Sequence, residues 1–236
     1  MGRIYETRKA TMFKRFAKMS KAFNRIGREI EIAVKSGVTD PKLNPRLRLA
    51  IQNGKSVNMP KERIEAAINR AAAKETAGYL EVLYEGYGPH GIAMMVECAT
   101  DNPTRSVANI RMIFSRNGGS LASTGSIAFM FERKGIFKVA AEGIPNLDDF
   151  ELEMIDHGLE EMEKQDSDVF IYTSFQDFGK MHKALEEKGI KTINTELQYI
   201  PTTTKALPEA DAKEVQILID ALEEDDDVQS VFNTMA

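Results

Sequence analysis

The chain has 236 residues, of which 42% are hydrophobic and 28% charged, and it contains a single cysteine. This length allows two or three cores of roughly 100 residues each. One cysteine and three scattered histidines exclude an intrachain disulfide and make a metal site unexpected. Because no apolar run is long enough for a membrane span or a signal-peptide core, we expect a cytoplasmic protein with no membrane partner. We also expect no metal and no cofactor.

Positive charge is concentrated at the amino-terminal end, although the whole chain has a formal net charge of −5. Residues 3–28 hold nine cationic side chains and one acid, Glu6, a balance of 9 − 1 = +8. Up to Gly78, 18 Lys and Arg residues and 7 Asp and Glu residues give a net charge of +11. From Tyr79 onward, 13 Lys and Arg residues and 29 Asp and Glu residues give a net charge of −16. Separated charge of this kind favours a polyanionic partner, above all nucleic acid. The alternative is an ordinary solvated, lysine-rich surface on a helical lobe.

Apolar spacing predicts three helices in the basic part of the chain. In the first, residues 19–34, apolar side chains from Met19 to Val34 recur three and four positions apart and share one face. Residues 3–17 lack a clean apolar stripe, so we expect them to form an arm that orders on its partner. Asn44-Pro45 and Pro60 are start signals for the second and third helices. The prediction is a three-helix bundle with a basic exterior.

From Tyr79 the apolar period changes from about 3.6 to two, which predicts an α+β (mixed α/β) remainder. The predicted strands are 79–84, 92–99, 121–130, 135–140, 169–173, 191–200 and 228–232. The predicted helices are 104–116, 147–163, 175–188 and 209–222. Because a terminal helix–strand pair cannot bury both its faces alone, we expect it to complete the domain that begins at residue 79. The expected domains are 1–78, then 79–133 with 206–236, and an inserted acidic domain, 134–205, the last two being small, sandwich-like α/β units.

Nothing in the sequence argues for an enzyme. Glycines 86, 88 and 91 match a G-x-G-x-x-G spacing, but they lie between two predicted strands, so tight-turn geometry is the better interpretation. The acidic stretches 148–163 and 223–227 lack the pattern of a calcium loop and are expected to be solvated faces. No nucleophile and base are spaced for catalysis.

Several motifs together resemble the YebC/PmpR family of probable transcriptional regulators, which is related to a mitochondrial translational activator. The motifs are N-P-R-L-R (44–48), N-M-P-K-E-R-I-E-A-A-I (58–68), Y-E-G-Y-G-P-H-G (84–91), V-E-C-A-T-D-N (96–102), F-S-R-N-G-G-S-L (114–121), G-S-I-A-F-M-F-E-R-K-G (125–135) and D-V-Q-S-V-F-N (227–233). Much of the family opens with G-H-S-K-W-A-N-I-K-H-R-K, whereas this chain reads G-R-I-Y-E-T-R-K (2–9), which keeps the Arg8-Lys9 pair but not the upstream His and Trp. The resemblance implies three domains, with the third inserted in the second.

The resemblance also implies two functions: binding of promoter DNA as a transcriptional regulator, or association with the ribosome or RNA as a translation factor. A basic lobe suits both, because phosphate contacts do not distinguish DNA from RNA. No RNA-binding aromatic motif is visible on the predicted strands. A third possibility is a protein-interaction adaptor that uses the acidic domains. The oligomeric state stays open. The candidate nucleic-acid-binding residues are Arg3, Arg8, Lys9, Lys14, Arg15, Lys18, Lys21, Arg25, Arg28, Arg46, Arg48 and Lys55.

Overall fold

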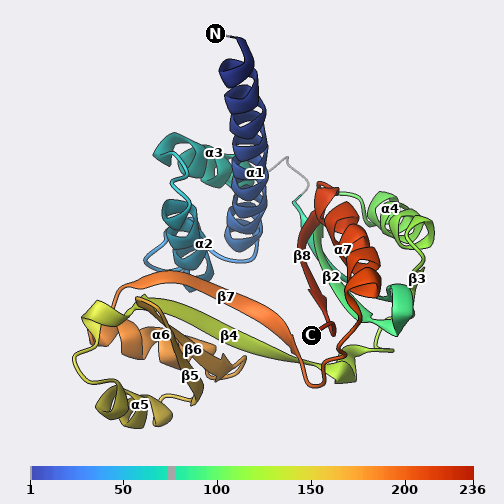
Figure 1. The fold of residues 1–236 in the computed structure, drawn as a ribbon. Helices are drawn as coiled ribbons and strands as arrows, with labels where there is room; N and C mark the ends of the chain where they lie inside the picture. Colours follow the sequence, from blue (N-terminus) through green and yellow to red (C-terminus); the bar gives the residue numbers. More distant parts are fainter. Residues whose placement is uncertain (1, 74–77) are drawn as a thin grey trace. The chain divides into compact units, whose positions relative to one another are not determined.

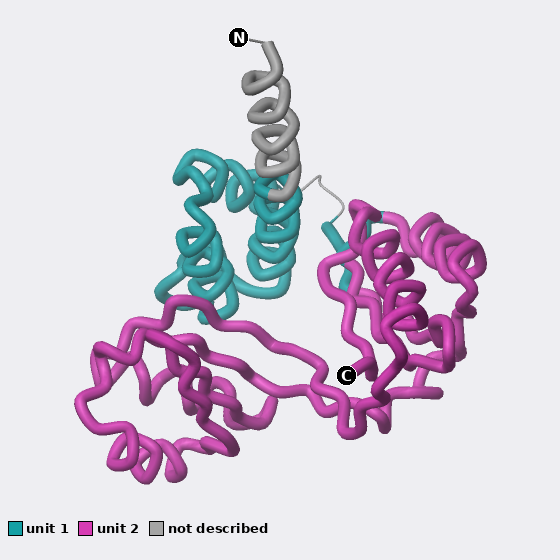
Figure 2. The backbone as a smooth tube through the Cα atoms, in the orientation of Figure 1, with its two compact units in different colours: residues 1–81, 99–101 teal, residues 82–98, 102–236 magenta. Residues whose placement is uncertain are grey.

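The structure is a computed structural model that describes the backbone of residues 2–73 and 78–236, and side chains from Met19 onward within those ranges. It divides into two compact units, residues 1–81 with 99–101 and residues 82–98 with 102–236 (Figure 2). The mixed α/β fold class expected from the sequence is confirmed, with a helical unit followed by two four-stranded sheets (Figure 1). The boundaries of the three expected domains stay a prediction.

The first unit contains three helices, α1 (Gly2–Lys35), α2 (Pro45–Ser56) and α3 (Lys61–Ala72). The Asn44 side chain caps α2 by accepting a hydrogen bond from the Leu47 backbone N–H at 3.0 Å, which explains the start that Asn44-Pro45 predicted. The core is formed by apolar side chains of all three helices, among them Phe23, Ile30, Leu47 and Ile64. Helices α1 and α3 therefore enclose one hydrophobic core together with α2.

One expectation for the first helix is wrong, and another is not tested. The backbone is helical from Gly2, and the ordering of residues 3–17 on a partner stays a prediction. Met19, expected on the apolar face, is 37% exposed. It lies one turn before the buried Phe23, so among the described side chains the core stripe begins at Phe23.

The second unit begins with a sheet in the order β3-β1-β2-β8. Its strands are β1 (Leu80–Tyr87), β2 (Ala93–Thr100), β3 (Ser120–Leu121) and β8 (Val228–Asn233). A short helical turn, η1 (Pro89–Gly91), joins β1 to β2, and helices α4 (Pro103–Arg116) and α7 (Glu209–Glu224) share a core with the sheet. Strand β8 pairs antiparallel with β2, so the end of the chain returns to the strands that follow residue 79.

The other sheet of this unit has the order β5-β6-β4-β7, and its paired strands are all antiparallel. Its elements in chain order are β4 (Phe131–Ala140), η3 (Ala141–Gly143), α5 (Leu147–Ile155), β5 (Leu159–Gln165), β6 (Asp168–Ser174), α6 (Phe178–Glu187) and β7 (Thr192–Pro201). This is the β-α-β-β-α-β arrangement of ferredoxin-like folds. Side chains of α5 and α6 form one core with β4 and β6, so both helices cover the same face of the sheet (Figure 1).

Two predicted elements are corrected here. The helix expected over 147–163 ends at Ile155, and β5 follows after Gly158, whose φ of +90° favours glycine. Strand β5 is at the edge of its sheet, where charged side chains are tolerated. Its acidic composition therefore did not indicate a strand in the sequence. The strand expected over 121–130 is also wrong: β3 ends at Leu121, and the turn η2 (Ala128–Met130) precedes β4.

A buried carboxylate explains why 121–130 is not a strand. Glu85 is 3% exposed and accepts hydrogen bonds from the backbone N–H groups of Gly125, at 2.5 Å, and Ile127, at 2.8 Å. These donors bond to a side chain and are not used in a strand ladder. The segment is therefore a loop held by Glu85.

Candidate nucleic-acid interface

Six of the candidate cations lie where the structure gives no side-chain positions. Arg3, Arg8, Lys9, Lys14, Arg15 and Lys18 belong to helix α1, but their side chains lie outside the described residues. What these six residues contact stays a prediction.

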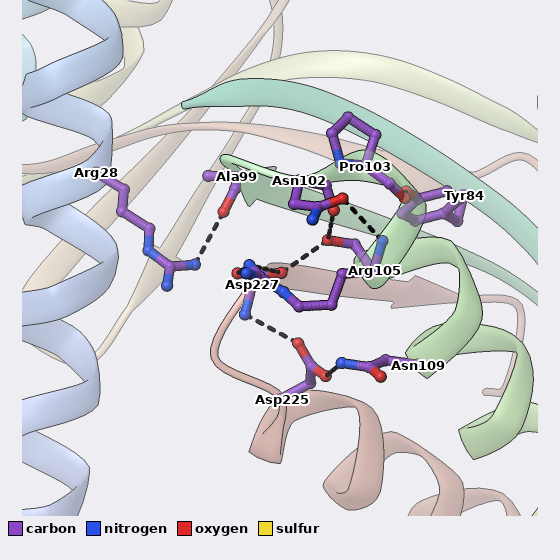
Figure 3. Close-up of polar contacts among 10 residues, drawn as sticks. Arg28, Tyr84, Ala99, Asn102, Pro103, Arg105, Asn109, Asp225 and Asp227 are labelled. Atoms are coloured by element: carbon purple, nitrogen blue, oxygen red, sulfur yellow. Dashed lines mark hydrogen bonds and ion pairs between the residues drawn. The ribbon is translucent and has the colours of Figure 1, made fainter. Parts of the chain in front are cut away.

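Lys21, Arg25 and Arg28 are the described candidates on α1, and all three are half-buried. Their spacing of four and three residues places them on one side of the helix. The Arg28 guanidinium donates a hydrogen bond from Nη1 to the backbone carbonyl oxygen of Ala99 at 2.8 Å (Figure 3). It also lies 4.9 Å from the ring centre of Tyr79, a cation–π contact. Arg28 is thus already engaged within its own compact unit, which includes Tyr79 and residues 99–101.

The candidates on α2 differ from one another in exposure and contacts. Arg46 is exposed and forms an ion pair with the Glu81 carboxylate, whereas Arg48 is half-buried. Lys55 is exposed in the last turn of the helix. Of these three, Lys55 is the residue whose charge is most directly accessible to a phosphate group.

Helix α3 adds cations that the sequence-based candidate set leaves out. Arg70 is 61% exposed and forms an ion pair of 2.8 Å with Glu31, whose side chain is only 6% exposed. The Arg63 guanidinium lies 5.5 Å from the Phe23 ring centre, and the Lys61 ammonium lies 3.4 Å from Glu65. The helical spacing of these residues was visible in the sequence, but the contacts of Arg63 and Arg70 with α1 depend on the packing of α1 against α3.

Glu31 is a buried acid in an otherwise basic unit. Burial raises the pKa of its carboxyl group above the ordinary value, and the charge and hydrogen bond of Arg70, with the charges of Arg28 and Lys35, offset part of this effect. Its ion pair holds Arg70 against α1. Glu31 is therefore a positioning residue for this part of the surface.

The charge balance of the helical unit remains positive after these internal pairs are counted. Between residues 19 and 73 there are 11 Lys and Arg and 5 Asp and Glu, a balance of 11 − 5 = +6. Residues 3–18 add 6 − 1 = +5. Such a surface is suited to bind phosphate groups by charge, with an affinity that falls as salt rises.

The second unit contains a polar cluster that the sequence did not reveal. Asp227, expected in a solvated acidic stretch, is 4% exposed. Its carboxylate accepts a hydrogen bond from Arg105 Nη2 at 2.9 Å (Figure 3). It accepts another from Ser106 Oγ at 2.7 Å. The expectation of a solvated face is therefore wrong for Asp227, because α4 brings an arginine and a serine to the start of β8. This cluster joins α4 to β8 and resembles a structural ion pair.

The described residues provide neither a metal-binding cluster nor a membrane-spanning helix. Within residues 19–73 and 78–236, His, Cys, Asp and Glu form no group of three or more arranged to hold a metal ion. None of the helices described is both long enough and apolar enough to cross a membrane.

Comparisons with known proteins match both units of the chain. A family model described as "TACO1/YebC protein N-terminal domain" matches residues 3–74, and one described as "TACO1/YebC second and third domain" matches residues 79–235. Relatives named "Probable transcriptional regulatory protein" from Anaeromyxobacter dehalogenans and Cytophaga hutchinsonii are each 52% identical, covering 100% of this chain and 100% and 99% of their own lengths. The crystal structure of a conserved hypothetical protein from Aquifex aeolicus aligns with a TM-score of 0.81 at 36% identity, covering 93% of this chain and 91% of that chain.

Proposed function

Because the chain belongs to the TACO1/YebC family, whose curated relatives are named probable transcriptional regulatory proteins, we propose that it is a non-enzymatic cytoplasmic regulator that binds DNA through its helical unit. The observation that carries this proposal is the separation of charge. The chain has a balance of +11 up to Gly78 and −16 after it. The positive charge supplies affinity for phosphates, and the negative charge repels nucleic acid from the second unit.

Helix α1 is the main element of the proposed interface. It continues without a break from Gly2 to Lys35, and its second half is anchored by Phe23, Ile26 and Ile30 in the core. An anchored helix presents its cations in fixed register to a phosphate backbone. Accessible cations on α2 and α3, such as Lys55 and Arg63, extend the basic surface.

A salt titration tests the phosphate contacts. If about six phosphates are neutralised, the affinity for duplex DNA should fall by roughly a thousandfold between about 50 and 200 mM salt. An affinity that does not change over this range would overturn the proposal.

The kind of nucleic acid is tested separately, by crosslinking in cells followed by sequencing of what is bound. Enrichment of promoter DNA supports the transcriptional role. Enrichment of ribosomal RNA would replace it with the role of a ribosome-associated translation factor. Recovery of neither would favour an adaptor that acts through its acidic second unit.

A further inference from the structure

The sheet β5-β6-β4-β7 has one face covered by helices and a second face that carries a different set of side chains. On the central strands, Phe137 and Val139 of β4 and Val169 and Ile171 of β6 are fully buried under α5 and α6. The residues that alternate with them on these two strands are half-buried or exposed. We call this second face the open face; it includes Ile136 and Lys138 of β4 and Phe170 and Tyr172 of β6.

Aromatic rings lie at the centre of the open face. Phe170 and Tyr172 are two residues apart on β6, and they pair with Lys138 and Ile136 of β4. Aromatic rings on the central strands of such a four-stranded sheet are used by RNA-recognition domains to stack unpaired bases. The same geometry also accepts a flat cationic group, since a guanidinium stacks on an aromatic ring. The charge around the rings decides between these ligands.

The charge of the open face is negative. The registers place five carboxylates on it, against Lys134 and Lys138, a balance of 2 − 5 = −3; the five are Glu132, Glu161, Glu163, Asp168 and Glu196. Both lysines are already paired: the Lys134 ammonium lies 3.2 Å from Glu160 and 3.4 Å from Glu132, and that of Lys138 lies 2.7 Å from Asp168. A phosphate backbone would meet net repulsion here, whereas a cationic ligand would be attracted.

The carboxylates lie next to the rings. Strand pairing sets Glu161 opposite Tyr172 and Glu163 opposite Phe170. Burial raises the pKa of the Tyr172 hydroxyl, and the charges of Glu163 and Glu161 raise it further, which agrees with negative charge close to this ring. An arginine side chain on this face would therefore find a ring to stack on and a carboxylate for its N–H groups at the same place.

From this juxtaposition we propose that the open face docks an arginine-rich segment of another protein. Its guanidinium groups stack on Phe170 and Tyr172 and pair with Glu161 and Glu163. The unit already makes contacts of this kind, because the Arg133 guanidinium lies 4.3 Å from the Phe175 ring centre and the Lys138 ammonium 5.5 Å from that of Phe170. The proposal does not depend on nucleic-acid binding by the helical unit.

The test uses the full chain and a fluorescent peptide with six arginines separated by Gly-Ser, followed by anisotropy. A peptide of the same design with six lysines in place of the arginines is the control ligand. We expect the arginine peptide to bind about fivefold or more tightly than the lysine peptide, because only guanidinium stacks and pairs in a fork. Equal affinities of the two peptides would overturn the proposal.

Two charge-reversal variants locate the site. Glu161→Lys/Glu163→Lys changes exposed residues of edge strand β5. Glu151→Lys/Asp156→Lys makes the same change of charge at exposed positions of α5 and the turn after it. We expect the first variant to lower the affinity for the arginine peptide about tenfold. The second should lower it less than about twofold, since distant exposed charges are screened. Equal losses in both variants would show attraction to overall charge and no site.

Two further ligands complete the experiment. A single-stranded RNA oligonucleotide whose binding is weakened by Phe170→Leu/Tyr172→Leu would overturn the proposal in favour of base stacking. A synthetic peptide of residues 3–18 that binds the open face more tightly than the arginine peptide would also overturn it, because the occupant would then be the basic end of this chain. Failure of both ligands to compete with the arginine peptide is the expected result.

Discussion

The Nη2 atom of Arg105 lies 2.9 Å from Oδ2 and 3.3 Å from Oδ1 of Asp227, so one guanidinium nitrogen contacts both carboxylate oxygens. The two residues are 122 positions apart in the chain. The Asp227 side chain is 6% exposed, and that of Arg105 is 48% exposed. The carboxylate is thus buried, and most of the solvent exposure of the pair belongs to the arginine.

Asp227→Ala should lower the free energy of unfolding by about 3 kcal/mol, because it removes the buried carboxylate that accepts hydrogen bonds from Ser106 and Arg105. Chemical denaturation measures the change. Asp220→Ala is the matched control, since Asp220 is an exposed carboxylate on α7 that bonds only to Gln216 at 2.7 Å among the contacts described, and it should change stability by less than about 0.5 kcal/mol. Similar losses in both variants would show that Asp227 has no special role.

Arg28→Ala should lower the free energy of unfolding by about 1 kcal/mol, because it removes the hydrogen bond to Ala99 and the contact with Tyr79. Lys21 and Arg25 are half-buried like Arg28, so reversing the charge of all three residues should lower stability as well as binding.

Lys55→Glu separates binding from stability. Lys55 is exposed, so the variant should keep the melting temperature of the parent chain. If Lys55 contacts a phosphate, the slope of log affinity for DNA against log salt should fall by about one. An unchanged slope would place Lys55 outside the interface.

Glu31 predicts a pH dependence of stability. Burial raises its pKa in the folded state above the unfolded value, so its favourable contribution is present below the unfolded pKa and is lost as pH rises through the folded pKa. The wild type should therefore lose stability relative to Glu31→Gln as pH rises from about 4.5. Urea denaturation of both proteins at several pH values gives the difference. A difference that moves the other way would show that the Arg70 ion pair outweighs burial.

Gly135→Ala should destabilise the second unit by roughly 1–3 kcal/mol, the usual range for overpacking. A Cβ atom at Gly135 would lie 2.3 Å from Cδ2 of Phe178 and 3.0 Å from Cγ2 of Thr173. Gly143→Ala is the control, because a Cβ there would meet no atom within 4 Å. The midpoints of thermal unfolding of the two variants measure the difference. Equal midpoints would mean that Phe178 moves away from the added Cβ without a loss of stability.

Much of the fold was predictable because its signals are local. The Asn44-Pro45 start of α2 depends on residues three positions apart, and the core face from Phe23 to Val34 depends on helical period alone. Strand β5 was missed because an edge strand tolerates the charges that also suit an exposed helix. The segment 121–130 was missed because Glu85, some 40 residues earlier, binds its backbone.

The candidate site was predicted less well than the fold. Charge counting finds the basic unit, since it needs no coordinates. It does not show that Arg28 bonds to Ala99, 71 residues later, or that Glu31 holds Arg70. Likewise, the aromatic pair Phe170 and Tyr172 becomes a surface only when the strand registers are known. Contacts between distant segments decide which charged side chains are accessible.

Strands β4 and β7 are the first and the last strand of the second sheet in chain order, and they pair with each other, with Phe131 opposite Pro201. The segment between these residues therefore leaves and rejoins the rest of the chain at adjacent points. Because its two ends are neighbours, we expect that a short connection between Phe131 and Pro201 can replace this segment while the remainder of the chain keeps its fold.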